Sequence, residues 1–380
     1  MRFLSYFNSP STVYSMKSSI IITILALTSL LFCPSDLNAK PRHRYFKTTD
    51  AEFFKTDTAR QIGARILLFQ RVTGGWPKNT DLVSPMTAAQ VSKVLQDKSR
   101  VDDSTIDNNA TTMEMRFLAQ LNNACPSEVY RTAISKGLDF LLSGQYENGG
   151  WPQFWPDPKG YQVHITYNDD AMYNTLSLFQ DLLSGNGPYK NIIDAEMASK
   201  LQRSVDKAVE VILDTQIKVN GEPTVWCQQH DRDTYAPAKA RAYELPSFTS
   251  LESANLLKFL MSLPNPDERV KKAVHGGIKW LDRNKITGMR YERPRDKDGK
   301  AITAQLVSDP DATPIWSRYY DLDECLPFFC DRDGIPRRSL DEIGFERRTG
   351  YGWYDARPNE VFAIYSEWAD RYDPENKLRF

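Results

Sequence analysis

The sequence predicts a protein dominated by α-helices, arranged as an (α/α) toroid with long irregular loops and a few short strands. Three observations lead to this fold class. Apolar residues recur at helical spacing along the chain, few segments alternate as strands do, and a Gly-Gly-Trp-Pro turn follows two helical segments, at 74–77 and 149–152. A turn that recurs after successive helices is typical of helix pairs repeated around a ring.

The predicted helices share one pattern. Their apolar residues are three or four positions apart, so that one face of each helix is buried. The segments are 62–69, 113–121, 134–142, 172–179, 205–212, 256–260 and 270–281. The irregular segments between them are rich in Pro, Gly, Trp and Asp, notably 73–86, 146–170, 217–246 and 290–336. Loops of this length on a helical scaffold usually carry function.

Two weaker copies of the repeated turn follow later helices, at 221–226 and 288–291. The repeat would bring Trp76, Trp151 and Trp226 to the same end of the ring. Indole faces suit carbohydrates, because sugar rings stack their C–H faces on aromatic side chains. We therefore expect Trp76 and Trp151 to bind substrate. Burial of an indole beneath its own turn is the alternative for each of them.

The composition excludes several classes of protein. The chain has 380 residues, with 48 Lys and Arg against 49 Asp and Glu, and a formal charge of −1. A chain so close to neutrality is neither a polybasic nucleic-acid binder nor an acidic disordered tail. Hydrophobic residues make up 41% and aromatic residues 12%, which is enough for a large core. We expect a monomer that binds no nucleic acid.

Residues 1–39 are predicted to be a secretory signal peptide, which leaves 40–380 as one functional domain. Lys17 precedes an apolar run, and a small-residue cleavage site lies just before Lys40. The run is shorter than the roughly 20 apolar residues that span a bilayer, so stable membrane insertion is not expected. The protein is expected to be periplasmic or secreted, and lipid attachment through Cys33 is the less favoured alternative.

Four cysteines remain after the predicted cleavage: Cys125, Cys227, Cys325 and Cys330. An exported protein permits disulfides, and Cys325 and Cys330 are close enough in sequence for a local bridge. Two buried free thiols account for this pair equally well. No histidine lies near it, so a zinc site is not expected.

Two oxygen-rich clusters each precede a predicted helix. The first is Ser-Thr-Ile-Asp-Asn-Asn-Ala-Thr-Thr at 104–112, and the second is Ile-Thr-Tyr-Asn-Asp-Asp-Ala-Met at 165–172. A helix N-cap accounts for one such residue but not for several in a row. Clusters from neighbouring repeats can converge at one end of a toroid, where carboxylate and amide oxygens suit Ca²⁺. Neither cluster is an EF-hand loop, so the spacing alone is a weak metal signal.

A third cluster, at 235–247, holds Lys239 and Arg241 among aromatic residues and prolines. Such rigid surroundings favour a function over solvated surface charge. Ser247 is expected to cap the following helix. A further candidate is Arg332, which precedes a tight Asp-Gly turn.

Together these motifs resemble the family 10 pectate lyases, in order from about residue 50 to 360. They are Gly-Gly-Trp-Pro at 74–77, Thr-Ile-Asp-Asn-Asn-Ala-Thr at 105–111, Gly-Gly-Trp-Pro-Gln-Phe at 149–154, the segment 161–172, Arg-Ala-Tyr-Glu-Leu-Pro-Ser at 241–247 and Arg-Asp-Gly at 332–334. The resemblance implies an (α/α) toroid and an exported, endo-acting lyase. Such an enzyme cleaves α-1,4-polygalacturonate by Ca²⁺-assisted β-elimination to 4,5-unsaturated oligogalacturonides.

The resemblance also implies a calcium and substrate-carboxylate site. Asp107, Asn108 and Asp169 resemble its ligands, and Asp170 is expected to contact substrate. The sequence departs from the family where Asn109 replaces a frequent Gly. It also departs after residue 318, where the segment carries cysteines that the pattern lacks.

Arginine residues are implied in the remaining roles. Arg241 resembles the Brønsted base, and Arg332 resembles an arginine that binds a substrate carboxylate. An arginine base conflicts with a pKa that ordinarily lies above about 12. Lys239 is the chemical alternative, because the pKa of a lysine shifts more readily than that of an arginine.

Two other functions remain open from the residues alone. A glycoside hydrolase on the same helical scaffold would use two carboxylates, Asp107 together with Asp169 or Glu244. A non-catalytic protein that binds acidic polysaccharides would use the tryptophan face without cleaving the chain. Spectroscopy of the products separates the three, since only a lyase makes an unsaturated uronide.

Overall fold

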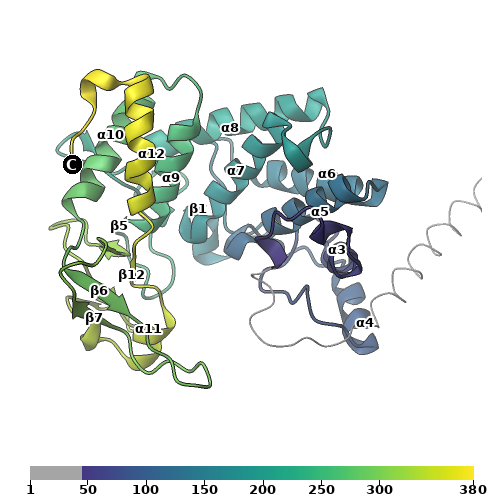
Figure 1. The fold of residues 1–380 in the computed structure, drawn as a ribbon, viewed down its shortest axis with the longest axis horizontal. Coiled ribbons are helices and arrows are strands. Elements are labelled where there is room, and N and C mark those ends of the chain that lie inside the picture. The colour runs from purple at the N-terminus through teal and green to yellow at the C-terminus, as the bar shows by residue number, and fades with distance from the viewer. Residues whose placement is uncertain (1–44) are drawn as a thin grey trace, which may run out of the picture.

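The computed structural model describes residues 45–380, so the predicted signal peptide at 1–39 lies outside the described residues. Helices dominate the fold, as predicted (Figure 1). The α-helices are α3 (Asp57–Phe69), α4 (Ala88–Asp97), α5 (Thr112–Ala124), α6 (Glu128–Gly144), α7 (Ala171–Ser184), α8 (Ala195–Thr215), α9 (Leu251–Ser262), α10 (Glu268–Arg283), α11 (Phe345–Gly350) and α12 (Asn359–Tyr372).

The helices form two layers. In the inner layer α5 contacts α7, α7 contacts α9, and α9 contacts α12. In the outer layer α6 contacts α8 and α8 contacts α10, and each of these outer helices packs on an inner one. Figure 1 shows α5, α7 and α9 in succession across the molecule, with the N-terminal helix α3 beside α5. This paired arrangement is the predicted (α/α) toroid.

The strands are short and pair only locally. Among residues 45–380 they form six antiparallel pairs. The pairs are β1 (Ile165–Thr166) with β4 (Gln229–His230), β2 (Lys218–Val219) with β3 (Glu222–Pro223), β5 (Phe248–Thr249) with β9 (Tyr319–Tyr320), β6 (Met289–Glu292) with β7 (Gln305–Ser308), β8 (Trp316–Ser317) with β12 (Tyr354–Asp355), and β10 (Phe329–Cys330) with β11 (Pro336–Arg337). They tie distant loops together rather than building a layer.

The helix boundaries follow ordinary capping. Thr56 accepts a hydrogen bond from the Ala59 amide at the start of α3, and Asp267 accepts one from Val270 at the start of α10. The prediction that Ser247 caps α9 is wrong. This helix begins at Leu251, and the Ser247 hydroxyl instead donates to its own loop.

The tryptophan turn occurs four times and stabilises the ring of helices. Each indole Nε1 donates to a carbonyl near the end of the preceding helix. The bonds are Trp76 to Ile66 (2.7 Å), Trp151 to Leu141 (2.7 Å), Trp226 to Ile212 (2.7 Å) and Trp316 to Leu281 (2.8 Å). The fourth copy was predicted at 288–291 but lies at Trp316, because the β6–β7 hairpin is inserted before it.

A glutamine joins each of the first three turns to the next outer helix. Every one of these side-chain amides donates both to a carbonyl of its own turn and to a carbonyl in α6, α8 or α10. The bonds are Gln70 to Gly74 and Ala133, Gln145 to Gly149 and Ser204, and Gln216 to Thr224 and Ala273. Each glutamine thereby bridges a carbonyl of its turn and a carbonyl within the next outer helix, which fixes the repeats to one another.

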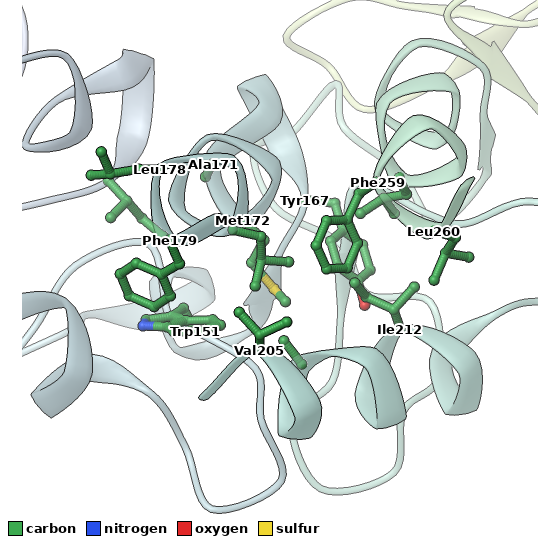
Figure 2. Packing of buried hydrophobic residues seen from close by; sticks show 14 of the residues in the cluster. Trp151, Tyr167, Ala171, Met172, Leu178, Phe179, Val205, Ile212, Phe259 and Leu260 are labelled. Carbon is green, nitrogen blue, oxygen red and sulfur yellow. The ribbon is translucent and has the colours of Figure 1, made fainter. Parts of the chain in front are cut away.

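The core between the two layers is apolar and continuous. Figure 2 shows Trp151 beneath Phe179 of α7, with Met172 and Val205 beside them. The rings of Trp151 and Phe179 are 6.3 Å apart, edge to face. All four cysteines at 125, 227, 325 and 330 are free thiols. No helix within 45–380 combines the length and apolarity needed to cross a bilayer.

Candidate active site

Two acidic turns with the same backbone conformation lie against each other. The first acidic turn is η2 (Asp107–Asn109) and the second is η4 (Asn168–Asp170). In each turn the last two residues are left-handed: Asn108 (φ 52°), Asn109 (φ 63°), Asp169 (φ 50°) and Asp170 (φ 61°). Asp107 is therefore the structural equivalent of Asn168. The predicted convergence of the two clusters is confirmed.

The conformation explains one departure from the family pattern. Asn109 has a positive φ, a region that glycine adopts freely and that asparagine tolerates better than most residues. Its side-chain oxygen also accepts a hydrogen bond from Asn174 of α7 at 2.6 Å. The asparagine keeps the turn that a glycine would make and adds a contact to the next helix.

The tryptophans lie beneath these turns rather than at the surface. Trp76 is 1% exposed and Trp151 is 0% exposed. The prediction that they stack on sugar rings is wrong, because each indole is enclosed in the core and bonded to a helix carbonyl. Their carbonyls accept from the amides of Thr105 and Thr166, two residues before each acidic turn. The tryptophans thus position the acidic turns from below.

Asp107 is buried and carries one unpaired oxygen. Lys78 forms an ion pair with Oδ2 of Asp107, and its ammonium group also lies 5.3 Å from the centroid of the Phe154 ring. The other oxygen, Oδ1, has no hydrogen-bond partner among the described residues. A buried carboxylate oxygen without a partner is unfavourable unless a cation or donor completes it. Neighbouring Asn108 is exposed and donates to Asn79.

Arg318 links the second acidic turn to α9. Its Nη2 donates to Asn168 at 3.1 Å, to Asp169 at 3.3 Å and to Glu252 at 2.7 Å. Because only 10% of this side chain is exposed, the guanidinium is a fixed positive charge beside the turn. Although burial lowers the pKa of Arg318, Tyr351 and the carboxylates around it raise the value well above normal.

The sequence analysis did not identify Arg318 as a site residue. One signal could have found it, since this arginine follows the fourth tryptophan turn by two residues. Because the fourth turn was predicted at 288–291 instead of at Trp316, the position of Arg318 after that turn was not recognised.

Asp170 lies on the far side of the second acidic turn. Its carboxylate is 3.4 Å from Nη1 of Arg357, which also binds Asp355. Burial, reinforced by the charge of Glu252, raises the pKa of Asp170 to about 6. The side chain is therefore held by Arg357 in the loop that precedes α12.

Arg241 is held by a two-pronged ion pair. Its Nε donates to Oε2 of Glu244 at 2.7 Å, and its Nη2 donates to Oε1 of the same carboxylate. Burial lowers the pKa of Arg241, but the hydrogen bonds and charge of Glu244 outweigh this and raise the pKa above that of a free arginine. The carboxylate thus opposes the deprotonation that a base at this position requires.

Three arginines, including Arg241, lie around the Tyr243 ring. The guanidinium carbons of Arg241, Arg332 and Arg347 lie 5.0, 5.9 and 4.5 Å from its centroid. Arg332 is 64% exposed and pairs with Glu346. Lys239 is exposed, and its ammonium group lies beside Gly334 in the loop of Arg332. The structure therefore brings Arg241, Lys239 and Arg332 together, as predicted.

Tyr161 is a partly buried tyrosine in the 161–172 segment. Burial raises the pKa of its phenol, and the charges that act on it include both Arg241 and Asp107. Charges from both halves of the candidate site therefore act on this phenol. Tyr161 lies within a recognised motif but was not predicted as a site residue.

The acidic turns fit a hard cation such as Ca²⁺. Among residues 45–380, no three carboxylate, imidazole or thiol groups gather at one point. Asp107 and Asp169 offer two carboxylates in the adjacent acidic turns, with amide oxygens beside them, and Oδ1 of Asp107 is unpaired. Oxygen ligands of this kind suit Ca²⁺, with the remaining positions left to water or an acidic substrate.

A cavity of about 820 Å³ lies elsewhere, between α10 and the loops around residues 219–224 and 322–325. None of the predicted site residues lines it. Its lining mixes lysines with carboxylates, and its one histidine among the described residues, His275, is bonded to Asp373 and Tyr365. We place the candidate active site at the charged face around the acidic turns, where the unpaired carboxylate oxygen and the clustered arginines lie.

Solved structures of two polysaccharide lyases are similar to this chain. A family 10 polysaccharide lyase from Cellvibrio cellulosa is 32% identical, with a TM-score of 0.73 over 84% of this chain and 95% of its own. An aspartate-to-alanine mutant of such an enzyme, in complex with trigalacturonic acid, is likewise 32% identical, with a TM-score of 0.73 over 85% of this chain and 96% of its own. No curated protein sequence matches at a significant level.

The family model for pectic acid lyase matches residues 70–362. This range contains both acidic turns, Arg241 and Arg332. The chain belongs to the pectic acid lyase family.

Proposed function

We propose that the protein is a pectate lyase that cleaves α-1,4-polygalacturonate by Ca²⁺-assisted β-elimination. The carrying observation is the charged face that holds Asp107, whose Oδ1 is unpaired, and the arginine cluster of Arg241 and Arg332. The related solved enzyme with trigalacturonic acid supports a galacturonate as substrate. A nearly neutral protein needs such a local positive cluster to hold a polyanion.

The reaction removes the C5 proton of a galacturonate residue. This proton is α to a carboxylate, which resists a second negative charge. The electrons of the C5–H bond form the C4–C5 double bond, the C4–O bond breaks, and the leaving oxygen takes a proton from solvent. Ca²⁺ would neutralise the substrate carboxylate, and Asp107, Asn108 and Asp169 would hold it. Arg332, at the exposed edge of the cluster, would bind a further carboxylate of the polymer.

Arg241 is proposed as the group that receives the C5 proton. Its side chain is 41% exposed, so substrate can reach it. The pairing with Glu244 disfavours a neutral arginine, so only a minute fraction is competent near neutral pH and activity rises in alkali. Lys239 is exposed beside it and remains the alternative base.

One measurement tests the proposed function. Polygalacturonate is incubated with the enzyme, and the ultraviolet absorbance of the 4,5-unsaturated uronide is followed with EDTA, and then with Ca²⁺ or Mg²⁺ restored. Absorbance should grow, stop in EDTA and return with Ca²⁺, but return less with Mg²⁺ because Mg²⁺ demands a tighter octahedral site. Reducing ends without absorbance would identify a hydrolase, and no cleavage would identify a binding protein.

The hydrolase with the predicted carboxylate pairs receives little support from the described residues. Both carboxylates considered as partners of Asp107 are already paired with arginine, Asp169 with Arg318 and Glu244 with Arg241. A hydrolase needs one carboxyl group that can donate a proton to the leaving oxygen.

We also propose that the protein is exported, after cleavage of residues 1–39, and acts as a monomer. N-terminal sequencing of the cell-free or periplasmic fraction should begin at Lys40. Lipid-modified Cys33 at the N-terminus would contradict soluble export. Gel filtration of the mature protein should give the mass of one chain.

A further inference from the structure

A buried chain of hydrogen bonds connects the two halves of the candidate site. It begins at Glu244, the partner of Arg241, and ends at Glu252, the partner of Arg318. The contacts are Tyr351 Oη to Glu244 Oε1 (3.1 Å), Tyr351 Oη to Tyr319 Oη (2.6 Å), Tyr319 Oη to Gln228 Oε1 (2.7 Å) and Gln228 Nε2 to Glu252 Oε1 (2.8 Å).

Every residue of this hydrogen-bond network is buried. The exposed fractions are 1% for Glu244, 8% for Tyr351, 0% for Tyr319, 1% for Gln228 and 3% for Glu252. Buried polar networks define a unique arrangement when their members are satisfied, because an unpaired member is costly in a low dielectric. The Tyr351 hydroxyl holds Glu244 from the side that faces away from solvent, while Oε2 of Glu252 at the other end has no hydrogen-bond partner among the described residues.

Tyr351 connects Glu244 to the rest of the network. Each phenol has a single hydrogen: Tyr319 donates its hydrogen to Gln228, and Tyr351 can donate its own to Glu244 or to Tyr319, but not to both. Its ring also lies 4.7 Å from the guanidinium carbon of Arg318. Loss of this one hydroxyl would therefore free the Glu244 carboxylate while the ring could still pack.

The Arg241 guanidinium is aligned by this carboxylate. Its Nε and Nη2 are engaged by Glu244, and its backbone amide donates to the same side chain at 3.2 Å. Its Nη1 makes no hydrogen bond to any residue within 45–380. The fork thus fixes the plane of the guanidinium and leaves one nitrogen available to substrate.

We propose that Glu244 and Tyr351 are positioning residues for Arg241. This role rests on the proposed lyase function. Glu244 and Tyr351 themselves make no contact with substrate. The Tyr351 hydroxyl orients the Glu244 carboxylate, and the carboxylate sets the plane of Arg241 against the acidic turns. The network through Gln228 and Glu252 keeps that plane in register with Arg318.

The test compares three variants on polygalacturonate: Tyr351→Phe, Glu244→Gln and Tyr365→Phe. Tyr365 is the matched control, because it is a fully buried tyrosine in α12 whose hydroxyl bonds to His275 and Leu378, away from the site. Tyr351→Phe should lower kcat about 10-fold while KM changes less than about 2-fold, as expected for losing a hydrogen bond to a charged group that acts only in the transition state. Tyr365→Phe should lose comparable thermal stability and keep the kcat of the wild type.

Glu244→Gln keeps the size of the side chain but cannot accept both donors of the guanidinium fork. It should lower kcat further than Tyr351→Phe, again with KM little changed. A Tyr351→Phe enzyme with wild-type kcat, or one whose loss appears only in KM, would overturn the proposal. Wild-type formation of unsaturated product tests the lyase function separately, so a failed positioning role and a failed function give different results.

Discussion

The Nη2 of Arg318 lies 3.3 Å from Oδ1 of Asp169, across 149 residues of chain. The same nitrogen lies 2.7 Å from Oε1 of Glu252 in α9. One guanidinium thereby joins the second acidic turn, the next inner helix and the fourth tryptophan turn. The carboxylates at this end of the site depend on a cation that belongs to the protein.

The first prediction concerns this cation. Arg318→Met should lower the free energy of unfolding by about 3–5 kcal/mol, because it leaves buried Glu252 without its counter-charge. Urea titration followed by tryptophan fluorescence measures the change. The double variant Arg318→Met with Glu252→Gln should recover part of the loss, and equal stability of the single and double variants would contradict the pairing.

The second prediction separates the two proposed bases. Arg241→Ala and Arg241→Lys should each lower kcat by several orders of magnitude with a smaller change in KM, since the lost interaction belongs to the transition state. Lys239→Ala should retain most of kcat. If the Lys239 variant loses kcat and the Arg241 variants mainly raise KM, the base is Lys239. Initial rates of absorbance growth give both constants.

The third prediction concerns Arg332, which is exposed and paired only with exposed Glu346. Arg332→Ala should raise KM for polygalacturonate about 10-fold and leave kcat within a few-fold, because an arginine–carboxylate contact contributes to binding in the ground state too. Fully methyl-esterified pectin should be a poor substrate for the wild type. Equal rates on esterified and free polymer would count against recognition of the uronate charge.

The fourth prediction follows from the burial of the tryptophans. Trp151→Phe removes the indole bond to Leu141 and part of the core volume, and should lower the free energy of unfolding by about 2–4 kcal/mol. At temperatures well below the Tm its KM should match that of the wild type. A raised KM with unchanged stability would restore the sugar-stacking role.

The fifth prediction is a pH dependence from His230. Burial lowers the pKa of this histidine to about 4, and its ring is fixed between the Tyr235 carbonyl and the Cys227 amide. Since the unfolded chain binds a proton near pH 6.5, stability is present above that pH and is lost as the pH falls toward 4. The loss attributable to this group is roughly 3 kcal/mol.

His230→Gln should flatten that part of the profile, as measured by urea unfolding at a series of pH values. Carboxylates titrate over the same pH range. The contribution of His230 is therefore read from the difference between the unfolding free energies of variant and wild type at each pH. Parallel profiles would show that the histidine is not buried in the neutral form.

The helical scaffold could be predicted because burial on one face leaves a period of three to four residues in the sequence. Three α-helices of the described chain, α4, α11 and α12, escaped that signal; α11 has only six residues. In α4 only Val91 and Val94 are buried, so the stripe is too short to recognise, and α12 buries aromatic residues that also occur in loops. The β6–β7 hairpin displaced the fourth tryptophan turn, which no local pattern could reveal.

The candidate site was predicted where adjacent residues share a motif, and missed where it depends on tertiary contacts. The acidic turns and Arg241 are short local signatures. Arg318 and Tyr351 acquire their place only when segments far apart in the chain meet. Trp76 and Trp151 were wrongly placed on the surface, because sequence alone does not distinguish an indole that faces solvent from one that seals a repeat.

The left-handed backbone of the acidic turns has a consequence for how this enzyme could diversify. Asparagine and aspartate are the residues that both tolerate positive φ and offer an oxygen to a cation. Asn108 and Asp169 must satisfy both demands, so very few residue types are accepted at these two positions. Libraries aimed at new uronate substrates should hold the acidic turns constant and randomise the exposed loops that carry Lys239 and Arg332, where neither demand applies.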